Sequence, residues 1–276
     1  MKERLSNFEL LRVVAMLMIV WGHCNYYALG AVNQTDVITD PINSFIRIFL
    51  EQICVIGVNV FVLISGWFGI RPSFKGATSL LFQVCFYGAI ILGIGAIFHL
   101  PIPWGASLKV FFFGAAYWFV PSYLLLYILS PILNSFVENS TRIQLLTVLL
   151  SFFLIEFCLG WFTDTENFAG GYTTLCFVGL YLLARYIRKY SKVLIHFSVL
   201  SYLSIYLLLT IIPSVIALVC LRYLGNTLGA VRYCTPFVVG ASLFFILAFN
   251  RIEFKSRIIN QLMGGYSRSI SYISIL

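Results

Sequence analysis

The chain has 276 residues, of which 61% are hydrophobic and only 10% are charged. Soluble domains carry about 25% charged residues, so this composition excludes an ordinary soluble protein and indicates a polytopic membrane protein. The formal net charge of +8 does not indicate a nucleic-acid partner, because the basic residues fall between apolar runs, as in a topology signal.

Eight apolar runs approach the length of about 20 residues that a membrane-spanning helix needs. In chain order they lie near residues 8–29, 45–68, 77–99, 111–134, 143–162, 172–187, 194–221 and 234–250. The sixth run is short, and the fourth begins with a piece that could be shallow or re-entrant. The sequence therefore predicts an all-α, polytopic transmembrane helix bundle of about eight spans.

The positive charges orient this bundle. With the N-terminus in the cytoplasm, three basic residues flank the spans on the outer side: Lys109, Arg222 and Arg232. Thirteen fall on the cytoplasmic side: Lys2, Arg4, Arg71, Lys75, Arg142, Arg185, Arg188, Lys189, Lys192, Arg251, Lys255, Arg257 and Arg268. Because Lys and Arg gather in cytoplasmic loops, we expect a multi-pass protein of the cell membrane with a cytoplasmic N-terminus.

The first span carries two polar residues, Arg12 and His23, eleven positions apart. On a helix this separation is about 20° in azimuth and about 16 Å along the axis, so both side chains lie on one face at different depths. One interpretation is structural: Arg12 reaches the inner headgroups and His23 makes a buried hydrogen bond. The other is functional, because ionisable residues inside membranes are costly.

Four segments resemble the acyltransferase-3 family of integral membrane acyltransferases. "FELLRVVAMLMIVWGH" is similar to its first span, with an arginine, ten residues and a histidine. "GVNVFVLISGWFGI" (57–70) resembles its second-span motif, and "YWFVPSYLLLYILSPIL" (117–133) its Trp-containing span. "GGYTTLCFVGLYLLARYIRKY" (170–190) is similar to a later span of the polysaccharide O-acetyltransferase branch. The resemblance covers most of residues 5–262, in the family's order, as a single domain.

This resemblance implies transfer of an acyl group, usually acetyl from acetyl-CoA, to a hydroxyl of an extracytoplasmic glycan or lipid-linked sugar. A sugar hydroxyl is a poor nucleophile, and histidine is the usual base for it. His23 is then the expected catalytic base. Arg12 is expected to hold the polyanionic acyl-CoA, since a guanidinium can fork onto phosphate or a thioester carbonyl. No permanently bound cofactor is expected beyond acetyl-CoA as donor substrate.

Basic residues after the second span are further candidates for contacts with acyl-CoA. The family often has two arginines three apart there, whereas this chain has Arg71 and Lys75 four apart. Both residues also fit plain positive-inside anchors. Glu9, one helical turn before Arg12, is expected to orient the guanidinium.

Two polar residues of the second span, Asn59 and Ser65, either line the substrate track or hydrogen-bond neighbouring helices. In the same span Arg47 and Glu51 stand four residues apart, which predicts an ion pair. Glu156 in the fifth span has no partner nearby in the sequence. The seven cysteines are scattered singly without metal-ligand spacing, so no metal site is expected.

The resemblance stops at Leu262, and the last 14 residues, 263–276, form an atypical short tail. We expect a C-terminal truncation, with one or two spans lost. Two alternatives to the active enzyme follow from these features: an inactive remnant of it, or a transporter or flippase whose polar track conducts a solute. The spacing of Arg12 and His23 favours the enzyme over the transporter.

Overall fold

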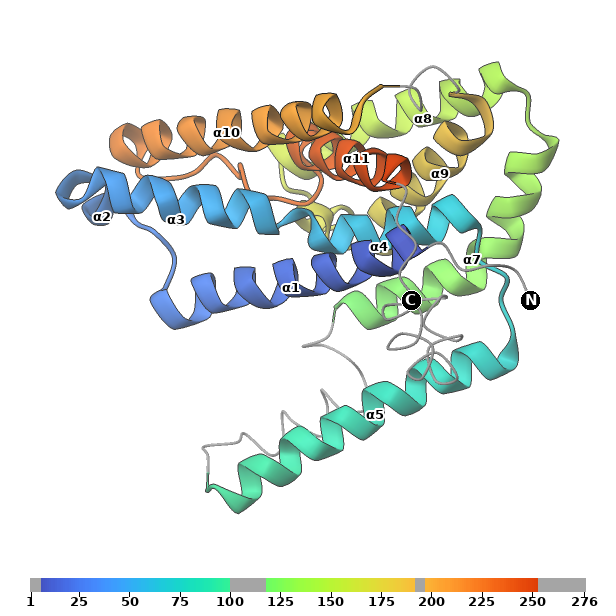
Figure 1. The fold of residues 1–276 in the computed structure, drawn as a ribbon, viewed down its shortest axis with the longest axis horizontal. Helices are drawn as coiled ribbons and strands as arrows, with labels where there is room; N and C mark the ends of the chain where they lie inside the picture. The colour runs from blue at the N-terminus through green and yellow to red at the C-terminus, as the bar shows by residue number, and fades with distance from the viewer. Residues whose placement is uncertain (1–5, 100–117, 192–196, 253–276) are drawn as a thin grey trace.

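The structure, a computed structural model, describes residues 6–99, 118–191 and 197–252 (Figure 1). The helices are α1 (Ser6–Leu29), α2 (Gln34–Thr39), α3 (Pro41–Cys54), α4 (Ile56–Phe68), α5 (Phe74–Ile97), α7 (Phe119–Asn139), α8 (Arg142–Glu156), α9 (Thr174–Tyr190), α10 (Val199–Leu224) and α11 (Pro236–Arg251). A π-helical turn, η1 (Phe157–Phe162), extends α8, and a 3₁₀ turn, η2 (Ala169–Gly171), precedes α9. These three described ranges contain no β-strand, and the predicted all-α helix bundle is confirmed.

Six described helical segments are long and apolar enough to cross a membrane. They are Ser6–Leu29, Pro41–Phe68, Phe74–Ile97, Phe119–Asn139, Arg142–Phe162 and Val199–Leu224. Each of the eight predicted runs overlaps a helix, but α9 has 17 residues and α11 only 16. The count of eight spans therefore stays a prediction. The start of the predicted run 111–134, residues 194–196 and the tail 263–276 lie outside the described residues.

The second span is longer than predicted and consists of two helices. Asp40 caps α3 with its side chain and Pro41 fills the first turn, so the helix begins four residues before the predicted start at 45. Val55 separates α3 from α4 but keeps helical dihedral angles of −57° and −28°. The two helices therefore run on as one span of 28 residues.

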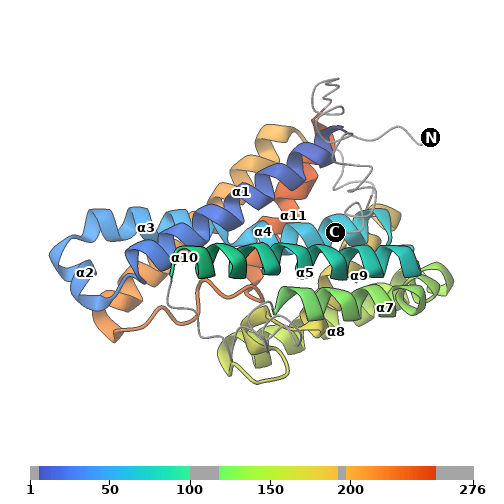
Figure 2. The same ribbon diagram turned by 90° about the horizontal axis from the view of Figure 1, so that it is seen from below.

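Helix α4 lies at the centre of the bundle, where it contacts α1, α9 and α11. Every residue from Ile56 to Trp67 is buried. Two glycines allow the close approaches: a Cβ on Gly57 would meet Ile19 and the Ala15 carbonyl of α1, and one on Gly66 would meet the backbone of Tyr181 in α9. Small residues at such crossings are typical of membrane bundles. Helix α5, by contrast, is set apart from the other helices in Figure 1, and in the view from below in Figure 2 it overlaps them.

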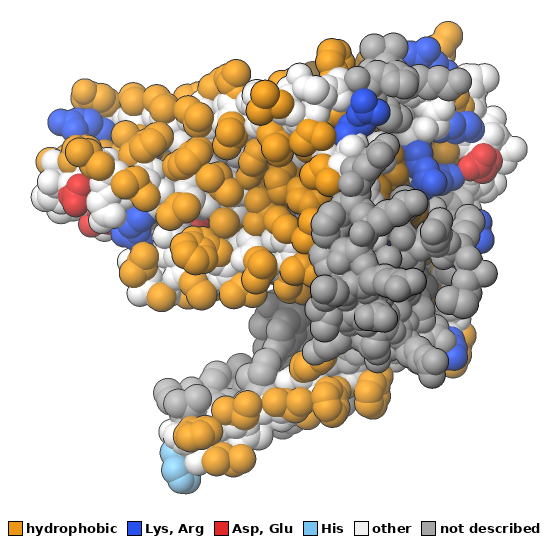
Figure 3. All heavy atoms as spheres, in the orientation of Figure 1, with side chains coloured by type: hydrophobic (Ala, Val, Ile, Leu, Met, Phe, Trp, Pro, Cys, Tyr) orange, Lys and Arg blue, Asp and Glu red, His pale blue; other side chains and the backbone are white. Residues whose placement is uncertain are grey.

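The bundle has two chemically different ends. One end, called the basic end from here on, carries Arg71, Lys75, Arg142, Arg185, Arg188, Lys189 and Arg251. There Arg185 of α9 forms an ion pair with Glu138 of α7 at 2.6 Å. At the loop end, the connections α1–α2, η1–α9 and α10–α11 meet, and Arg232 pairs with Asp164 at 2.6 Å. Apolar side chains cover the face between the two ends (Figure 3). This distribution suits a bundle whose middle lies in hydrocarbon.

Candidate functional site

One face of α1 is in contact with the bundle along its whole length. Its residues recur at a spacing of three or four, as a single helical face requires. Near the basic end this face is buried and includes Leu11, Arg12 and Ala15. Toward the loop end it opens into a pocket, which Met18, Ile19, Gly22, His23 and Tyr26 line. The face predicted to hold Arg12 and His23 is thus closed at the arginine and open at the histidine.

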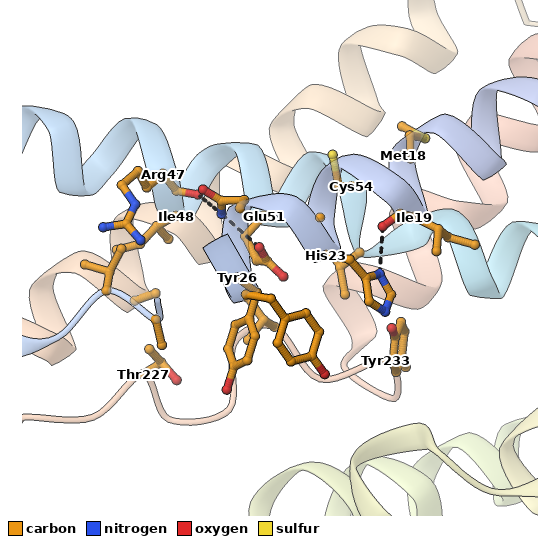
Figure 4. Close-up of a pocket in the computed structure, with 18 of the residues that line it drawn as sticks. Met18, Ile19, His23, Tyr26, Arg47, Ile48, Glu51, Cys54, Thr227 and Tyr233 are labelled. Carbon is orange, nitrogen blue, oxygen red and sulfur yellow. Dashed lines mark hydrogen bonds between the residues drawn. The ribbon is translucent and has the colours of Figure 1, made fainter. Parts of the chain in front are cut away.

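The pocket has a volume of about 430 Å³ and lies at the loop end. Besides α1, its wall includes Arg47, Glu51 and Cys54 of α3 (Figure 4) and Val58 of α4. The rest of the wall comes from α10 and from loops: Gly30 to Val32, Tyr172, Ala217 and Leu221 of α10, and Thr227, Val231 and Tyr233. The pocket therefore assembles from five separate stretches of the chain around the end of the first span.

The His23 ring is held in one tautomer. Its Nδ1 lies 2.7 Å from the Ile19 carbonyl oxygen, one turn earlier on α1. A carbonyl oxygen only accepts hydrogen bonds, so Nδ1 must carry the proton. In the neutral ring the lone pair then belongs to Nε2, and that edge points into the pocket on the side of Tyr233 (Figure 4). This geometry gives the pocket a base with its proton-accepting atom exposed.

The predicted ion pair between Arg47 and Glu51 is wrong. Arg47 donates through its Nη2 to the carbonyl oxygens of Leu29, at 3.1 Å, and Gly30, at 2.5 Å. Glu51 instead accepts a hydrogen bond of 2.9 Å from Asn25 Nδ2. The reason is tertiary: the end of α1 packs against α3 and offers both an amide and free terminal carbonyls, which a helix end leaves unpaired.

Aromatic side chains form much of the pocket wall. Tyr26 and Tyr27 are 51% and 76% exposed, and the Tyr27 ring stacks on His23 at 5.8 Å between centroids. Tyr172 and Tyr233 meet edge to face at 4.8 Å, and Trp118 packs behind Tyr172 at 4.5 Å. Burial raises the pKa of the Tyr233 phenol, which therefore stays a hydrogen-bond donor at neutral pH.

Arg12 lies outside this pocket. Its Nη1 pairs with Glu9 Oε1 at 2.5 Å, and both side chains are buried. Its Nε and Glu9 Oε2 have no hydrogen-bond partner among the described residues. The pocket ends at Met18, about 9 Å along the helix from Arg12. Glu9 thus contacts the Arg12 guanidinium, and the pocket that His23 lines does not extend to Arg12.

The remaining predicted site residues lie elsewhere. Asn59 donates to the Tyr233 carbonyl at 2.9 Å, and Ser65 meets the Tyr123 hydroxyl at 3.0 Å. Both are buried contacts between elements and are not part of the pocket wall. Arg71 and Lys75 are exposed at the basic end. A role for these four residues in binding substrate stays a prediction.

Comparison with known proteins identifies the family. The family model described as "Acyltransferase domain", the acyltransferase-3 domain, matches residues 5–274. The chain belongs to the acyltransferase-3 family. No curated protein and no solved structure matches the chain. Family membership and the six membrane-length helices make this protein a membrane acyltransferase.

In this acyltransferase-3 protein, sequence analysis found one pocket residue of clear chemical use, His23, and missed its neighbours. Asn25 and Tyr233 lie outside the quoted motifs, Tyr172 lies in one but was given no role, and the two tyrosines are 61 positions apart. Glu51 was noticed as an intramembrane charge but given the wrong partner. Only the meeting of the outer loops with α1 and α3 brings these residues together.

Proposed function

We propose that this membrane acyltransferase moves an acyl group, specifically acetyl, from cytosolic acetyl-CoA to a hydroxyl of an extracytoplasmic or lipid-linked glycan. His23 is the catalytic base. The observation that carries the proposal is the bond from Nδ1 to the Ile19 carbonyl, which leaves Nε2 as the proton acceptor in a pocket.

The chemical step follows from that tautomer. Nε2 of His23 removes the proton of the acceptor hydroxyl while the hydroxyl oxygen attacks the thioester carbonyl carbon. The C–S bond breaks, the thiolate of CoA leaves, and the imidazolium returns the proton to that sulfur. The products are an O-acyl ester and free CoA, and His23 regains its starting state. Nδ1–H donates to the Ile19 carbonyl oxygen throughout, so the ring keeps its orientation.

The donor is proposed to approach from the basic end, as its charge requires. Acyl-CoA is polyanionic, and the basic end gathers cations from α5, α8, α9, α11 and the connection after α4. Arg12 supports this route, because its buried Nε–H has no acceptor among the described residues and could bond a polar group of the donor other than the thioester that reacts at His23. With the basic end in the cytosol, the loop end and its pocket face outward, where the glycan is.

Replacement of His23 tests the base. We expect His23→Gln, which keeps a polar side chain of similar size, to lower glycan acetylation by about 10²–10⁴-fold, the usual contribution of a general base. The measurement is the alkali-labile acetate of surface glycan from cells that carry each variant. His99→Gln, at the far end of α5 and outside the pocket, is the control and should match the wild type. Undiminished acetylation in membranes that contain His23→Gln at normal abundance would remove His23 from the mechanism.

A further inference from the structure

The pocket holds a second hydrogen-bonding group suited to a hydroxylated substrate. Glu51 lines the pocket together with His23, and the two lie within electrostatic range of each other. Asn25 occupies only Oε2 of the carboxylate, at 2.9 Å. Among the described residues, nothing hydrogen-bonds Oε1. The carboxylate is therefore fixed by one oxygen and can accept a hydrogen bond with the other.

The charge balance of the pocket disfavours a polyanion. Glu51 is its one carboxylate among the described lining residues. Arg47 also lines the pocket; its Nη2 donates to the carbonyls of Leu29 and Gly30, and its Nε has no hydrogen-bond partner among the described residues. The formal charges of Arg47 and Glu51 cancel, so the described lining has no excess positive charge with which to attract a polyanion. The pocket thus suits an uncharged ligand rich in hydroxyl donors.

The wall is suited to the flat apolar face of a ring. Tyr27 is 76% exposed and Tyr172 is 44% exposed, and both line the pocket. Trp118 at 4.5 Å and Tyr233 at 4.8 Å pack against the Tyr172 ring and hold it in place. Rigid aromatic side chains supply contact area at low cost in conformational entropy. The C–H face of a pyranose ring is complementary to such a surface.

We propose that this pocket is the acceptor subsite, and that it binds an uncharged sugar ring with adjacent hydroxyls. Tyr27 and Tyr172 contact the ring, and Glu51 accepts a hydrogen bond from the hydroxyl next to the one that His23 deprotonates. This assignment rests on the proposed acyl transfer. It adds the class of acceptor, a neutral vicinal diol, and the residues that select it.

Steady-state kinetics with both substrates varied test the subsite. The assay measures transfer of radiolabelled acetyl from acetyl-CoA to glycan extracted from the host, by the full-length protein in nanodiscs. We expect Glu51→Gln to raise the KM for glycan by about 10- to 100-fold, the loss of one hydrogen bond to a charged acceptor, and to leave the KM for acetyl-CoA unchanged. Tyr27→Ala should act in the same direction.

Two matched controls lie at the loop end but outside the pocket. Glu166→Gln removes an exposed carboxylate, and Tyr223→Ala removes a tyrosine that is 73% exposed. Both should behave as the wild type. An unchanged KM for glycan in Glu51→Gln overturns the proposal. A raised KM for acetyl-CoA in that variant also overturns it, because the pocket would then hold the donor.

Binding separates this inference from the proposed reaction. If the wild type transfers no acetyl, the proposed function fails. Quenching of Trp118 fluorescence by an added sugar then still tests the pocket, and the Trp118→Phe variant provides the blank. Methyl α-glucopyranoside should quench the fluorescence of the wild type more strongly than its uronic acid counterpart does. Glu51→Gln should weaken the binding of the neutral sugar. Equal or tighter binding of the uronate, or no effect of Glu51→Gln, overturns the subsite.

Discussion

At the scale of single residues, Arg12 and His23 occupy different environments on the same face of α1. His23 faces a pocket and is held through Nδ1. Arg12 is sealed against α4 and paired with Glu9 at 2.5 Å. A buried charge without a partner is far more costly than a buried pair. The Arg12–Glu9 pair is therefore expected to matter for folding as well as for any contact with the donor.

A double-mutant cycle measures this dependence. Glu9→Met and Arg12→Met should each lower the free energy of unfolding by about 3–5 kcal/mol, because each leaves the opposite charge buried alone. The double variant should lose much less than the two single losses together. Unfolding in an SDS titration reports these free energies.

The exposed pair Arg185–Glu138 serves as the control for that cycle. Glu138 is 63% exposed, so Glu138→Met should change the free energy of unfolding by no more than about 1 kcal/mol. If the losses from Glu9→Met and Arg12→Met simply add, the two side chains act independently, and the pair has no such role.

At the scale of elements, the crossing of α4 and α9 fixes the centre of the bundle. A Cβ on Gly66 would lie 2.5 Å from the Tyr181 carbonyl oxygen and 2.9 Å from the Ala184 Cβ. Backbone atoms of a packed helix cannot move aside cheaply. Close approach of these helices therefore requires glycine at position 66, independently of any role of the motif in catalysis.

Gly66→Ala should consequently lower stability by roughly 1–3 kcal/mol, the usual cost of overpacking. The thermal midpoint in detergent, followed by size-exclusion chromatography, measures the loss. Gly93→Ala in α5 is the matched control, because no atom lies within 4 Å of the added methyl group. It should not be destabilising, since alanine favours the helix. A Gly66→Ala protein as stable as Gly93→Ala would show that α9 can shift away.

At the scale of the whole molecule, the two ends of the bundle differ in charge and in structure. The basic end presents cations and short connections, whereas the loop end has the longer connections that enclose the pocket. Because Lys and Arg gather on the cytoplasmic side, the basic end should lie in the cytosol. The proposed transfer of acetyl outward depends on this orientation.

Labelling of introduced cysteines tests the orientation. Asn226→Cys at the loop end should react with a membrane-impermeant maleimide in intact cells, and Asn139→Cys at the basic end only after permeabilisation. Both positions are exposed. The wild type, with Cys24 and Cys158 exposed, gives the background. The reverse pattern would place the pocket in the cytosol and rule out an extracytoplasmic acceptor there.

The sequence by itself determined the class of fold, the approximate position of the long apolar helices and the family. Hydrophobic runs suffice for this, because hydrocarbon demands helices that satisfy their own backbone hydrogen bonds. Helical periodicity also placed Arg12 and His23 on one face and Glu9 beside Arg12. These are local relations, fixed by a regular repeat within one element.

Only the tertiary structure decided which residues meet around His23. Glu51 pairs with Asn25 and not with Arg47, because the end of α1 lies against α3. Tyr172 and Tyr233 reach the pocket from loops whose path no periodicity determines. The same packing closed the face of α1 at Arg12 and opened it at His23. Contacts between distant segments depend on how whole helices pack, and for that reason the pocket could not be predicted from the sequence, whereas the position of His23 on one face of α1 could.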